Sequence, residues 1–340
     1  MRFTAAIRPR RRWSSPYLRD DPIFEEDIMS AAIDTETDGD LTKPGETLFA
    51  WSIFPLTMTA CVGLATHFHH REANPLVALL VPLGLGYLIV IACERIYPHA
   101  TSWTRSQDDV ATDTAWFFTG NATGLALRPL AAFLAIPIAG WLSAHFGSGL
   151  WPAKWPLVAQ LALSFVVVEF FHYWAHRWMH EIDFLWRFHA THHSAPRLYW
   201  LNANRFHVVD TTFLNLGFTV PLIALGADAR IFSLWIVASA IHGLFQHANM
   251  SIRCGPLNWI FSMAELHRWH HSRTVTESNT NYGSNLILWD VVFGTRFLPA
   301  DREAPKDIGI ADLSAFPMTW WRQMLSPFRW SAIKRASAKD

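Results

Sequence analysis

The first half of the chain alternates between long uncharged stretches and short polar links. Residues 48–66 form 19 consecutive positions without a charge, and residues 74–93 form 20. A helix needs about 20 apolar residues to cross a bilayer. The link between the two stretches, residues 67–73, is short and polar. The pattern therefore predicts an antiparallel pair of transmembrane helices.

Four further apolar stretches follow this pair. Residues 129–144 and 155–168 predict a second pair of spans. Residues 211–227 and 231–245 predict either another pair of spans or a shallow hairpin that dips into one leaflet. Aromatic and cationic residues mix in residues 316–330, which suits the headgroup zone. We therefore predict an all-α fold, an integral-membrane helical bundle of about four spans plus a re-entrant or interfacial helical hairpin.

Charge sets the predicted orientation. Four arginines lie within residues 8–12, and the positive-inside rule then places the N-terminus in the cytoplasm. Four crossings return the chain to the same side near residue 170, where arginines recur. We expect four segments: a cytoplasmic tail (1–46), a transmembrane hairpin region (47–150), a catalytic domain (151–300) and a cytoplasmic or interfacial C-terminal tail (301–340).

Composition narrows the class of protein. The chain is 51% hydrophobic and 16% charged, which supports the membrane interpretation. Lys+Arg and Asp+Glu balance at 28 each, so the basic excess typical of nucleic-acid binding is missing and no nucleic-acid partner is expected. The three cysteines lie far apart, which excludes a disulfide scaffold and a cysteine-rich zinc module.

Histidines are concentrated in one region at regular spacings. Twelve of the 17 fall between residues 172 and 271. The run FFHYWAHRWMH places three of them at i, i+4 and i+8 on one helical face. FHATHH and ELHRWHH then place three imidazoles each within about one helical turn. We predict ten metal ligands: His176, His180, His189, His192, His193, His242, His247, His267, His270 and His271.

A metal explains this density better than a protein core does. Neutral imidazoles packed closely leave ring nitrogens without partners, and protonated ones repel each other. A divalent metal removes both problems, although imidazole alone does not choose among Fe, Zn, Cu and Ni. Eight or more ligands exceed the need of one tetrahedral zinc and indicate a two-metal centre. A pH-sensing or solvated histidine face is the alternative.

Two questions remain about the predicted site: whether His242 reaches it, and which side chains accept the second N–H of each ligating imidazole. His242 lies five residues before His247, about 140° around a helix, so it reaches the same metal only if the helix is distorted. Ligating imidazoles donate their other N–H to a nearby group. Candidates for such partners are His172, Glu169, Glu265 and Asp290. His67, His69, His70, His99, His145 and His207 are expected to be ordinary surface or interfacial residues.

The histidine motifs carry a family resemblance. HRWMH, FHATHHS, NRFH, QHAN, HRWHHS, NYG and WDVVFGT, in this order over residues 160–298, resemble the fatty acid hydroxylase/sterol desaturase superfamily. The resemblance implies a cytosolic di-iron centre on a membrane helical bundle, in a bacterial member. Its HxxxH box falls on His176 and His180, and its two HxxHH boxes fall on the two triads.

The resemblance also implies a function. We expect an iron-dependent, O2-using lipid hydroxylase, a monooxygenase acting on an unactivated C–H bond of a fatty acyl chain or of an aminolipid such as an ornithine lipid. A lipid or sterol desaturase with the same centre is the alternative. A metal transporter or sensor is more distant, because transporters place polar ligands at mid-membrane depth, whereas these boxes lie beyond the apolar stretches in arginine-rich sequence.

Partners and location follow from the same reasoning. The sequence shows no P-loop, no GxGxxG in a βαβ context and no haem-binding motif, so electrons are expected from a separate reductase, ferredoxin or cytochrome. The expected location is a bacterial inner membrane with the site on the cytoplasmic side. Arg187, Arg197 and Arg205 are candidates for holding an anionic headgroup. The glycines of GLGYL, residues 84–88, lie inside a span and are expected to serve helix packing.

Overall fold

The computed structural model describes residues 44–147 and 149–339. The arginine cluster within residues 8–12, and most of the predicted tail 1–46, lie outside the described residues. The described residues all belong to one unit, Asp38–Asp340. Across them, β structure is limited to two isolated bridges, so the predicted all-α class is confirmed.

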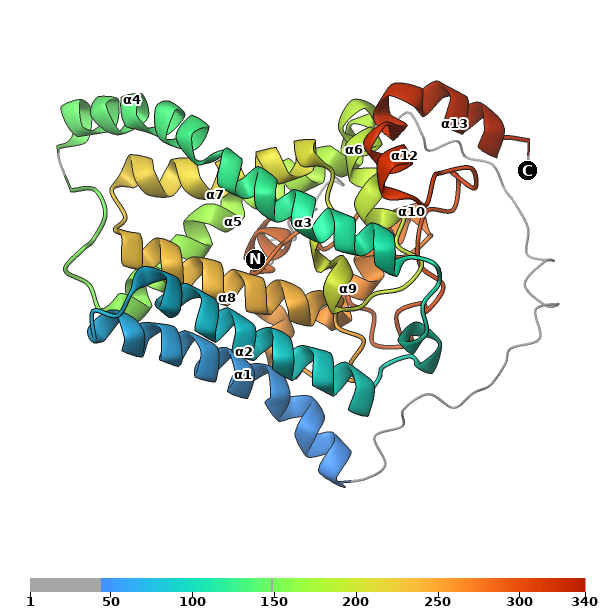
Figure 1. Ribbon diagram of the computed structural model, residues 1–340, viewed down its shortest axis with the longest axis horizontal. Helices are drawn as coiled ribbons and strands as arrows, with labels where there is room; N and C mark the ends of the chain where they lie inside the picture. Colours follow the sequence, from blue (N-terminus) through green and yellow to red (C-terminus); the bar gives the residue numbers. More distant parts are fainter. Residues whose placement is uncertain (1–43, 148, 340) are drawn as a thin grey trace, which may run out of the picture. The chain divides into compact units, whose positions relative to one another are not determined.

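Long apolar helices make up the bundle (Figure 1). Within the described part, six stretches are long and apolar enough to cross a membrane, which fits the alternative in which the late apolar pair is another pair of spans. The late apolar pair forms two helices of spanning length, and an additional helix precedes residue 128. The helices are α1 (Pro44–His70), α2 (Pro75–Ile96), α3 (Val110–Ala126) with α4 (Arg128–Phe146) as one stretch, α5 (Leu157–Glu181), α7 (Val208–Leu225) and α8 (Ala229–His247).

The count of uncharged residues missed α3 for a physical reason. Asp113 lies in its first turn, and Arg128 follows it at the start of α4, so charges interrupt the apolar run. Asp113 is buried in the protein and paired with Arg205. A charge neutralised inside the fold therefore hides a helix from any criterion based on uncharged length.

Shorter elements form what we call the polar cap, which comprises α6, η3 and residues 248–339. The ends of α2, α5 and α8 and the beginnings of α3 and α7 all lead into it or to its edge (Figure 1). Its elements, with the short η2 that precedes α3, are η2 (Thr101–Thr104), α6 (Asp183–His193), η3 (Trp200–Asn204), η4 (Gly255–Trp259), α9 (Ala264–His270), α10 (Val275–Ser278), α11 (Leu288–Phe293), α12 (Trp320–Met324), η5 (Ser326–Arg329) and α13 (Trp330–Ser337).

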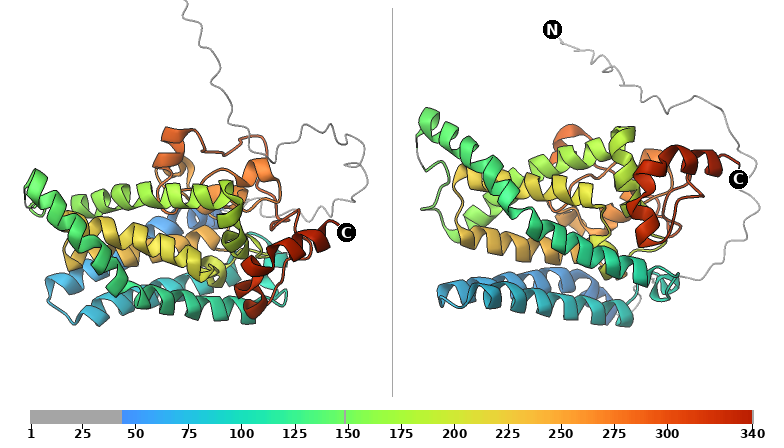
Figure 2. Two further views of the ribbon diagram at one scale, coloured as in Figure 1. Left: turned by 90° about the horizontal axis from the view of Figure 1, so that it is seen from above. Right: turned by 45° about the horizontal axis from the view of Figure 1, so that its top comes forward.

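Helix α8 lies in the middle of the bundle. It packs on the α1–α2 hairpin on one side and on α5 on the other, and α7 packs on α4 and α5 (Figure 2). Phe54, Val90, Ile241 and Phe245 belong to the core cluster between α1, α2 and α8. Because lipid tails are as apolar as these side chains, close packing holds such helices together more than exclusion of water does.

A glycine permits the close approach of α2 and α8. A Cβ atom added to Gly86 would lie 1.9 Å from Cδ1 of Ile241, whereas one added to Gly84 would meet nothing within 4 Å. A side chain at position 86 would have to displace the end of Ile241, so the glycine allows Ile241 to pack in its present position. The expected packing role of GLGYL is thus fulfilled by the second of its glycines.

Local signals set the helix ends that shape the bundle. Asn74 caps α2 by accepting a hydrogen bond from the backbone N–H of Leu76 at 2.9 Å, and Asp228 caps α8 in the same way. Gly226 ends α7 with φ of 89°, a conformation that glycine adopts without strain. Capping and chain reversal thus fit the turn between α7 and α8 into three residues, Gly226 to Asp228.

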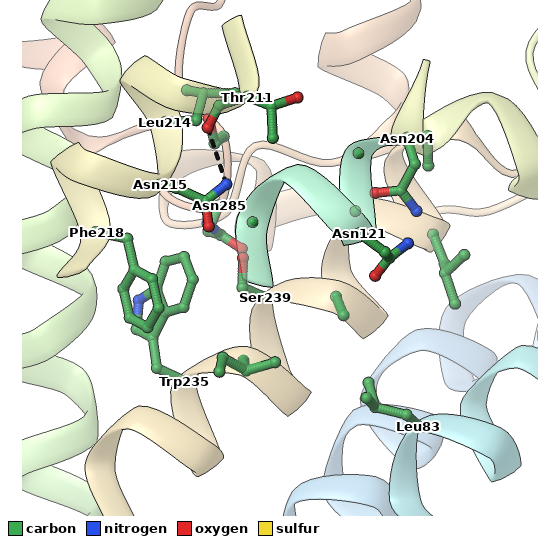
Figure 3. A pocket seen from close by; sticks show the side chains of 18 of the residues that line it. Leu83, Asn121, Asn204, Thr211, Leu214, Asn215, Phe218, Trp235, Ser239 and Asn285 are labelled. Carbon is green, nitrogen blue, oxygen red and sulfur yellow. Dashed lines mark hydrogen bonds between the residues drawn. The ribbon is translucent and has the colours of Figure 1, made fainter. Parts of the chain in front are cut away.

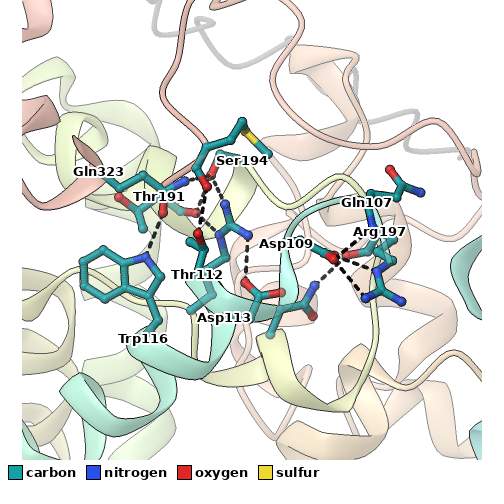
Figure 4. A network of polar contacts seen from close by, with 12 residues as sticks. Gln107, Asp109, Thr112, Asp113, Trp116, Thr191, Ser194, Arg197 and Gln323 are labelled. Atoms are coloured by element: carbon teal, nitrogen blue, oxygen red, sulfur yellow. Dashed lines mark hydrogen bonds and ion pairs between the residues drawn. The ribbon is translucent and has the colours of Figure 1, made fainter. Parts of the chain in front are cut away.

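Two buried ion pairs connect α3 to the segment that follows α6 (Figure 4). Arg197 donates to both carboxylate oxygens of Asp109, at 2.6 and 3.0 Å. Arg205 donates to Asp113 at 2.7 Å, and Tyr199 donates to the other oxygen of Asp113 at 2.9 Å. Neither arginine is exposed by more than 3%. Both are used in ion pairs inside the protein, so the expectation that they hold a lipid headgroup is not met.

Breaking one of these pairs should destabilise the fold strongly. Arg205→Met leaves the buried carboxylate of Asp113 without its cation, and removing one partner of a buried pair costs about 3–5 kcal/mol. We expect a clear loss of thermal stability in detergent. The control is Asp307→Asn in the Arg273–Asp307 pair, whose side chains are 46% and 81% exposed; such pairs contribute at most about 1 kcal/mol. Equal melting temperatures for the two variants would contradict this interpretation.

Candidate metal centre

Four helices bring nine of the ten predicted ligands together. Group A, named here, comprises His176, His180, His189, His193 and His270, and group B comprises His192, His247, His267 and His271. Within each group, nitrogen atoms that can serve as ligands all lie within 4.8 Å of one another. The histidines are buried, except that His180 is intermediate. The arrangement is that of two adjoining metal sites.

The two HxxHH boxes contribute to both groups in a crossed pattern. In α6, His189 and His193 share one face at i and i+4 and belong to group A, whereas His192 belongs to group B. In α9 the assignment is reversed: His267 and His271 belong to group B, and His270 to group A. Neighbouring residues on a helix point about 100° apart. Each box therefore bridges the two sites.

The spacing of the ring nitrogens fits metal coordination. Nε2 of His176 lies 3.0 Å from Nε2 of His189 in group A. In group B, Nε2 of His267 lies 2.9 Å from that of His247 and 3.1 Å from that of His271. With metal–nitrogen bonds of about 2.0–2.1 Å, two ligands at right angles have nitrogens about 3.0 Å apart. The ring nitrogens are thus placed as ligands of a common ion.

The protonation state of the rings also suits a metal. Burial, reinforced by neighbouring imidazoles, lowers the pKa of His189, His193 and His270 well below the usual value of 6.5. The same causes act on His192 and His271. The rings are therefore neutral at neutral pH, and the neutral imidazole is the form that binds metal.

Several inward nitrogens have no other use. Nε2 of His180, His193 and His270 is buried and has no hydrogen-bond partner among the described residues. Leaving buried nitrogens unpaired is costly. A transition-metal ion in each group would satisfy them, so the donor set fits the predicted two-metal centre.

Oxygen atoms orient the rings from outside. Nδ1 of His176 lies 2.7 Å from the carbonyl oxygen of Tyr282, and Nδ1 of His270 lies 2.8 Å from that of Thr280. Nδ1 of His247 lies 2.9 Å from Oδ1 of Asn202. An oxygen at this position requires the hydrogen on Nδ1 and leaves Nε2 free for a metal. Nδ1 of His180 is held in the same way by the side chain of Asn279, at 3.1 Å.

One ligand faces a carboxylate that the sequence analysis missed. Oδ2 of Asp210 lies 3.6 Å from Nδ1 of His189, and both side chains are 1% exposed. Neither carboxylate oxygen of Asp210 has a hydrogen-bond partner among the described residues. Asp210 follows the NRFH motif by three positions, but its distance of 21 residues from His189 gave no sign of contact.

His242 lies outside both groups, contrary to the prediction that counted it as a ligand. Its ring packs against Phe54 and Phe261, with centroids 5.8 and 6.1 Å away. Helix α8 is regular through this segment, so five residues of separation turn His242 away from His247. The distortion that would have brought it to the centre is absent from α8.

The predicted outer partners also lie elsewhere. Nε2 of His172 lies 2.9 Å from the carbonyl oxygen of Leu214 on α7, one turn away from the ligands. Glu265 accepts hydrogen bonds from the N–H of Cys254 and from Asn258, so it organises the loop after α8 instead of a ligand. Each of these side chains is committed to another element.

Glu169 and Asp290 do not contact the ligands directly. They hold the backbone of residues 282–284, which in turn contacts a ligand. Asp290 accepts hydrogen bonds from the backbone N–H groups of Tyr282 and Gly283, both at 2.8 Å. Glu169 accepts from the N–H of Ser284 at 3.0 Å. Together they fix the segment whose Tyr282 carbonyl meets His176. Both were predicted as hydrogen-bond partners of ligating imidazoles, but their side-chain hydrogen bonds go to the segment around residues 282–285 and to Thr295.

A cavity of about 1390 Å³ reaches both groups. Its lining includes His176 and His189 from group A and His192, His247 and His267 from group B. Away from the histidines its walls are formed by α2, α3, α7 and α8 (Figure 3). The candidate centre therefore lies at one end of a space large enough for a lipid chain.

Comparisons with known proteins agree with this geometry. The model of the fatty acid hydroxylase family matches residues 161–295. The chain is 40% identical over 255 residues to ornithine lipid hydroxylase OlsE of Rhizobium tropici, covering 74% of this chain and 76% of that protein. It is 30% identical over 171 residues to an alkylglycerol monooxygenase of Xenopus tropicalis, covering 50% of this chain and 38% of that protein.

A more distant relative extends the range of lipids. Methylsterol monooxygenase 1 of Rattus norvegicus is 26% identical over 145 residues, covering 42% of this chain and 48% of that protein. No solved structure matches the chain significantly.

Fold and site together define a multi-pass membrane protein with histidine clusters able to bind metal. The chain belongs to the fatty acid hydroxylase family. The predicted superfamily and the predicted class of enzyme, an oxidoreductase that hydroxylates lipids, are thereby confirmed.

The groups predict opposite effects for two buried histidines. His270→Ala removes one nitrogen from group A, so we expect a clear loss of bound metal per folded protein. His242→Ala removes a ring that faces Phe54 and Phe261, so we expect wild-type metal content. Elemental analysis of protein purified in detergent and reloaded with Fe(II) measures both. Metal loss in the His242 variant, with retention in the His270 variant, would refute the grouping.

Proposed function

We propose that this protein is an iron-dependent, O2-using hydroxylase of membrane lipids with one iron ion in each histidine group. The observation that carries the proposal is the convergence of nine imidazoles into two adjoining groups at the end of a lipid-sized cavity. Membership of the fatty acid hydroxylase family supports iron and O2 over other metal chemistry.

The reaction needs an oxidant stronger than any side chain. When bound, the two irons supply it by activating O2. The balanced reaction is R–H + O2 + 2 e⁻ + 2 H⁺ → R–OH + H2O, where R–H is the lipid. Group A residues hold one iron and group B residues the other. The electrons come from an external electron-transfer protein such as a reductase, a ferredoxin or a cytochrome.

The protein's own residues position the reactants and exclude water. The buried rings and the apolar walls of the cavity keep bulk water from the reacting carbon. The carbonyl oxygens of Tyr282 and Thr280 hold the rings of His176 and His270 so that Nε2 faces the metal. No side chain is needed as a nucleophile or as a general base.

Asp210 has a positioning role in this proposal. Its carboxylate lies 3.6 Å from Nδ1 of His189, where it would accept the Nδ1–H of this ring when Nε2 holds the metal. A carboxylate partner makes the imidazole a stronger donor than a neutral oxygen does. Group A would therefore bind metal more tightly with Asp210 than without it.

The favoured substrate is a membrane aminolipid such as an ornithine lipid. This chain covers 76% of a relative named ornithine lipid hydroxylase, against 38% of the alkylglycerol monooxygenase and 48% of the methylsterol monooxygenase. A fatty acyl position is the other target within this proposal. We further propose a bacterial inner-membrane location with the centre facing the cytoplasm. The division of the chain at residues 46, 150 and 300 stays a prediction.

Lipid mass spectrometry tests the proposed reaction. In cells that express the protein and contain ornithine lipids, we expect one lipid class to gain a single oxygen. Cells expressing His270→Ala at equal membrane level should lack this product, because group A loses a ligand. Loss of two hydrogens would instead establish desaturation. An unchanged lipid profile, with metal bound and a reductant supplied, would overturn the proposal.

The role of Asp210 is tested by metal affinity. For Asp210→Asn we expect the dissociation constant of the iron held by group A to rise by about 10–100-fold, as is typical for loss of an outer partner. Competition with a chelator in detergent measures this without any turnover. The control is Glu265→Gln, since the side-chain hydrogen bonds and ion pair of Glu265 go to Cys254, Asn258 and Arg253 and not to a ligand. An unaltered affinity in the Asp210 variant would leave Asp210 without this role.

A further inference from the structure

Helix α8, in the middle of the bundle, keeps one partly exposed face. It packs on α1, α2 and α5, yet a stripe of its residues at intervals of three or four positions is partly exposed. Such spacing corresponds to one face of a helix. We call this face the floor stripe; it comprises Phe232, Ser233, Ile236, Ser239, Ala240 and Gly243. All of these residues line the cavity, so the floor stripe is exposed through the cavity.

The cavity is open to the outside between α2 and α3. On the α2 side its lining includes Leu76 and Leu80, which are 63% and 58% exposed. On the α3 side its lining includes Leu125, which is 60% exposed. Side chains that faced only an enclosed space would not be exposed to this degree. We call the space between these leucines the side opening; Gly84 of α2 and Asn121 of α3 are also exposed along it.

The arrangement of the helices explains where the side opening lies. Near the polar cap, the ring of Tyr87 on α2 contacts Phe117 on α3 and Trp200 on η3, with centroids 6.1 and 5.9 Å away. Away from this contact, α2 and the α3–α4 stretch diverge (Figures 1 and 2). Both belong to stretches that are long and apolar enough to cross a membrane. The side opening therefore faces lipid tails.

Two glycines leave space along the path from the side opening to the histidines. A Cβ atom added to Gly84 or to Gly243 would meet nothing within 4 Å. Gly84 lies at the edge of the side opening, and Gly243 lies on the floor stripe. Gly243 also precedes His247 of group B by four positions, so the two share one face of α8. The space over Gly243 therefore adjoins group B.

Open space beside a helical glycine is not a function in itself. Gly63 on α1 and Gly140 on α4 have equally open surroundings, but neither lines the cavity. At Gly84 and Gly243 the open space is part of the cavity. A side chain at either position would narrow the path to the histidines without displacing any neighbour.

We propose that an acyl chain enters sideways from the bilayer through the side opening, lies on the floor stripe and reaches the histidines over Gly243. Gly84 keeps the side opening wide, and Gly243 keeps the space beside group B free for the reacting carbon. The two glycines thereby determine which chains reach the centre. The inference rests on the proposed hydroxylase function and names the route of its lipid substrate.

Photo-cross-linking tests the route without any turnover. The full-length protein is reconstituted in vesicles of a phosphatidylcholine that carries a diazirine in one acyl chain. We expect cross-links to residues 232–240 of the floor stripe, because these residues line the cavity. Gly84→Leu should lower the yield of these cross-links about tenfold, the factor expected when about two methylene groups of the chain lose their place.

Gly243→Leu separates arrival of the chain from its reaction. Cross-links to residues 232–240 should persist, because the added side chain lies beyond them on the path. In cells, the hydroxylated lipid should fall by about 100-fold, because misplacing the reacting carbon by about 1 Å costs that much. The iron content of the purified variant should equal that of the wild type. Gly243→Ala adds a single methyl group and should lose less product; it replaces the leucine variant in the test if the latter binds less iron.

Gly63→Leu is the matched control, because it adds the same side chain at an open helical glycine outside the cavity. It should equal the wild type in cross-links, iron and product. Equal cross-linking of the Gly84 and Gly63 variants, or no cross-link to the floor stripe of the wild type, would overturn the inference and leave lipid hydroxylation intact. Cross-links as expected, with no lipid gaining oxygen, would overturn the proposed function and leave the route in place.

Discussion

Neutral imidazoles that face one another across about 3 Å are the constraint on which this structure depends. In group B, Nε2 of His267 is within 3.1 Å of two other ring nitrogens. Neutral rings share at most one hydrogen per contact, and charged rings repel each other, so the arrangement is stable only around a cation. The crossed HxxHH boxes place ligand nitrogens of both groups on the same pair of helices. A shift of either helix would therefore change both groups together.

The surroundings of the centre make the two groups unequal. Four outer nitrogens, those of His176, His180, His247 and His270, face neutral oxygens, whereas that of His189 faces the buried carboxylate of Asp210. An anion beside one group favours the higher charge on its metal. The two ligand sets are otherwise chemically similar, so the buried carboxylate gives them a different electrostatic environment.

Local periodicity explains which parts could be predicted from the sequence. His176 and His180, or His267 and His271, lie at i and i+4, so helical geometry alone brings them together. The same rule placed His242 off the ligand face. Asp210 and Asn202 reach the ligands because α7 and η3 pack beside them. The spacing of these two residues in the sequence does not indicate this contact. Glu265 shows the opposite error, in which closeness in sequence was taken for contact. It lies two residues before His267, but its carboxylate binds the loop at Cys254.

The membrane helices show the same limit. Uncharged length found α1 and α2, but it overlooked α3, since Asp113 is neutralised by Arg205, far along the chain. A hydropathy criterion reads each residue in isolation, whereas burial of a charge is decided by a partner that only the fold supplies.

Helix α8 carries one of the candidate ligands and also forms a wall of the cavity along its whole length. His247 lies at its last position, and the residues before it line the cavity down to Ala229. Each turn adds about 5.4 Å, so the position of a residue on α8 gives its distance from the histidine groups. Phe232 and Ile236 line the cavity between its two ends. The size of the side chains at these two positions therefore limits the space available along α8 without altering the histidine groups.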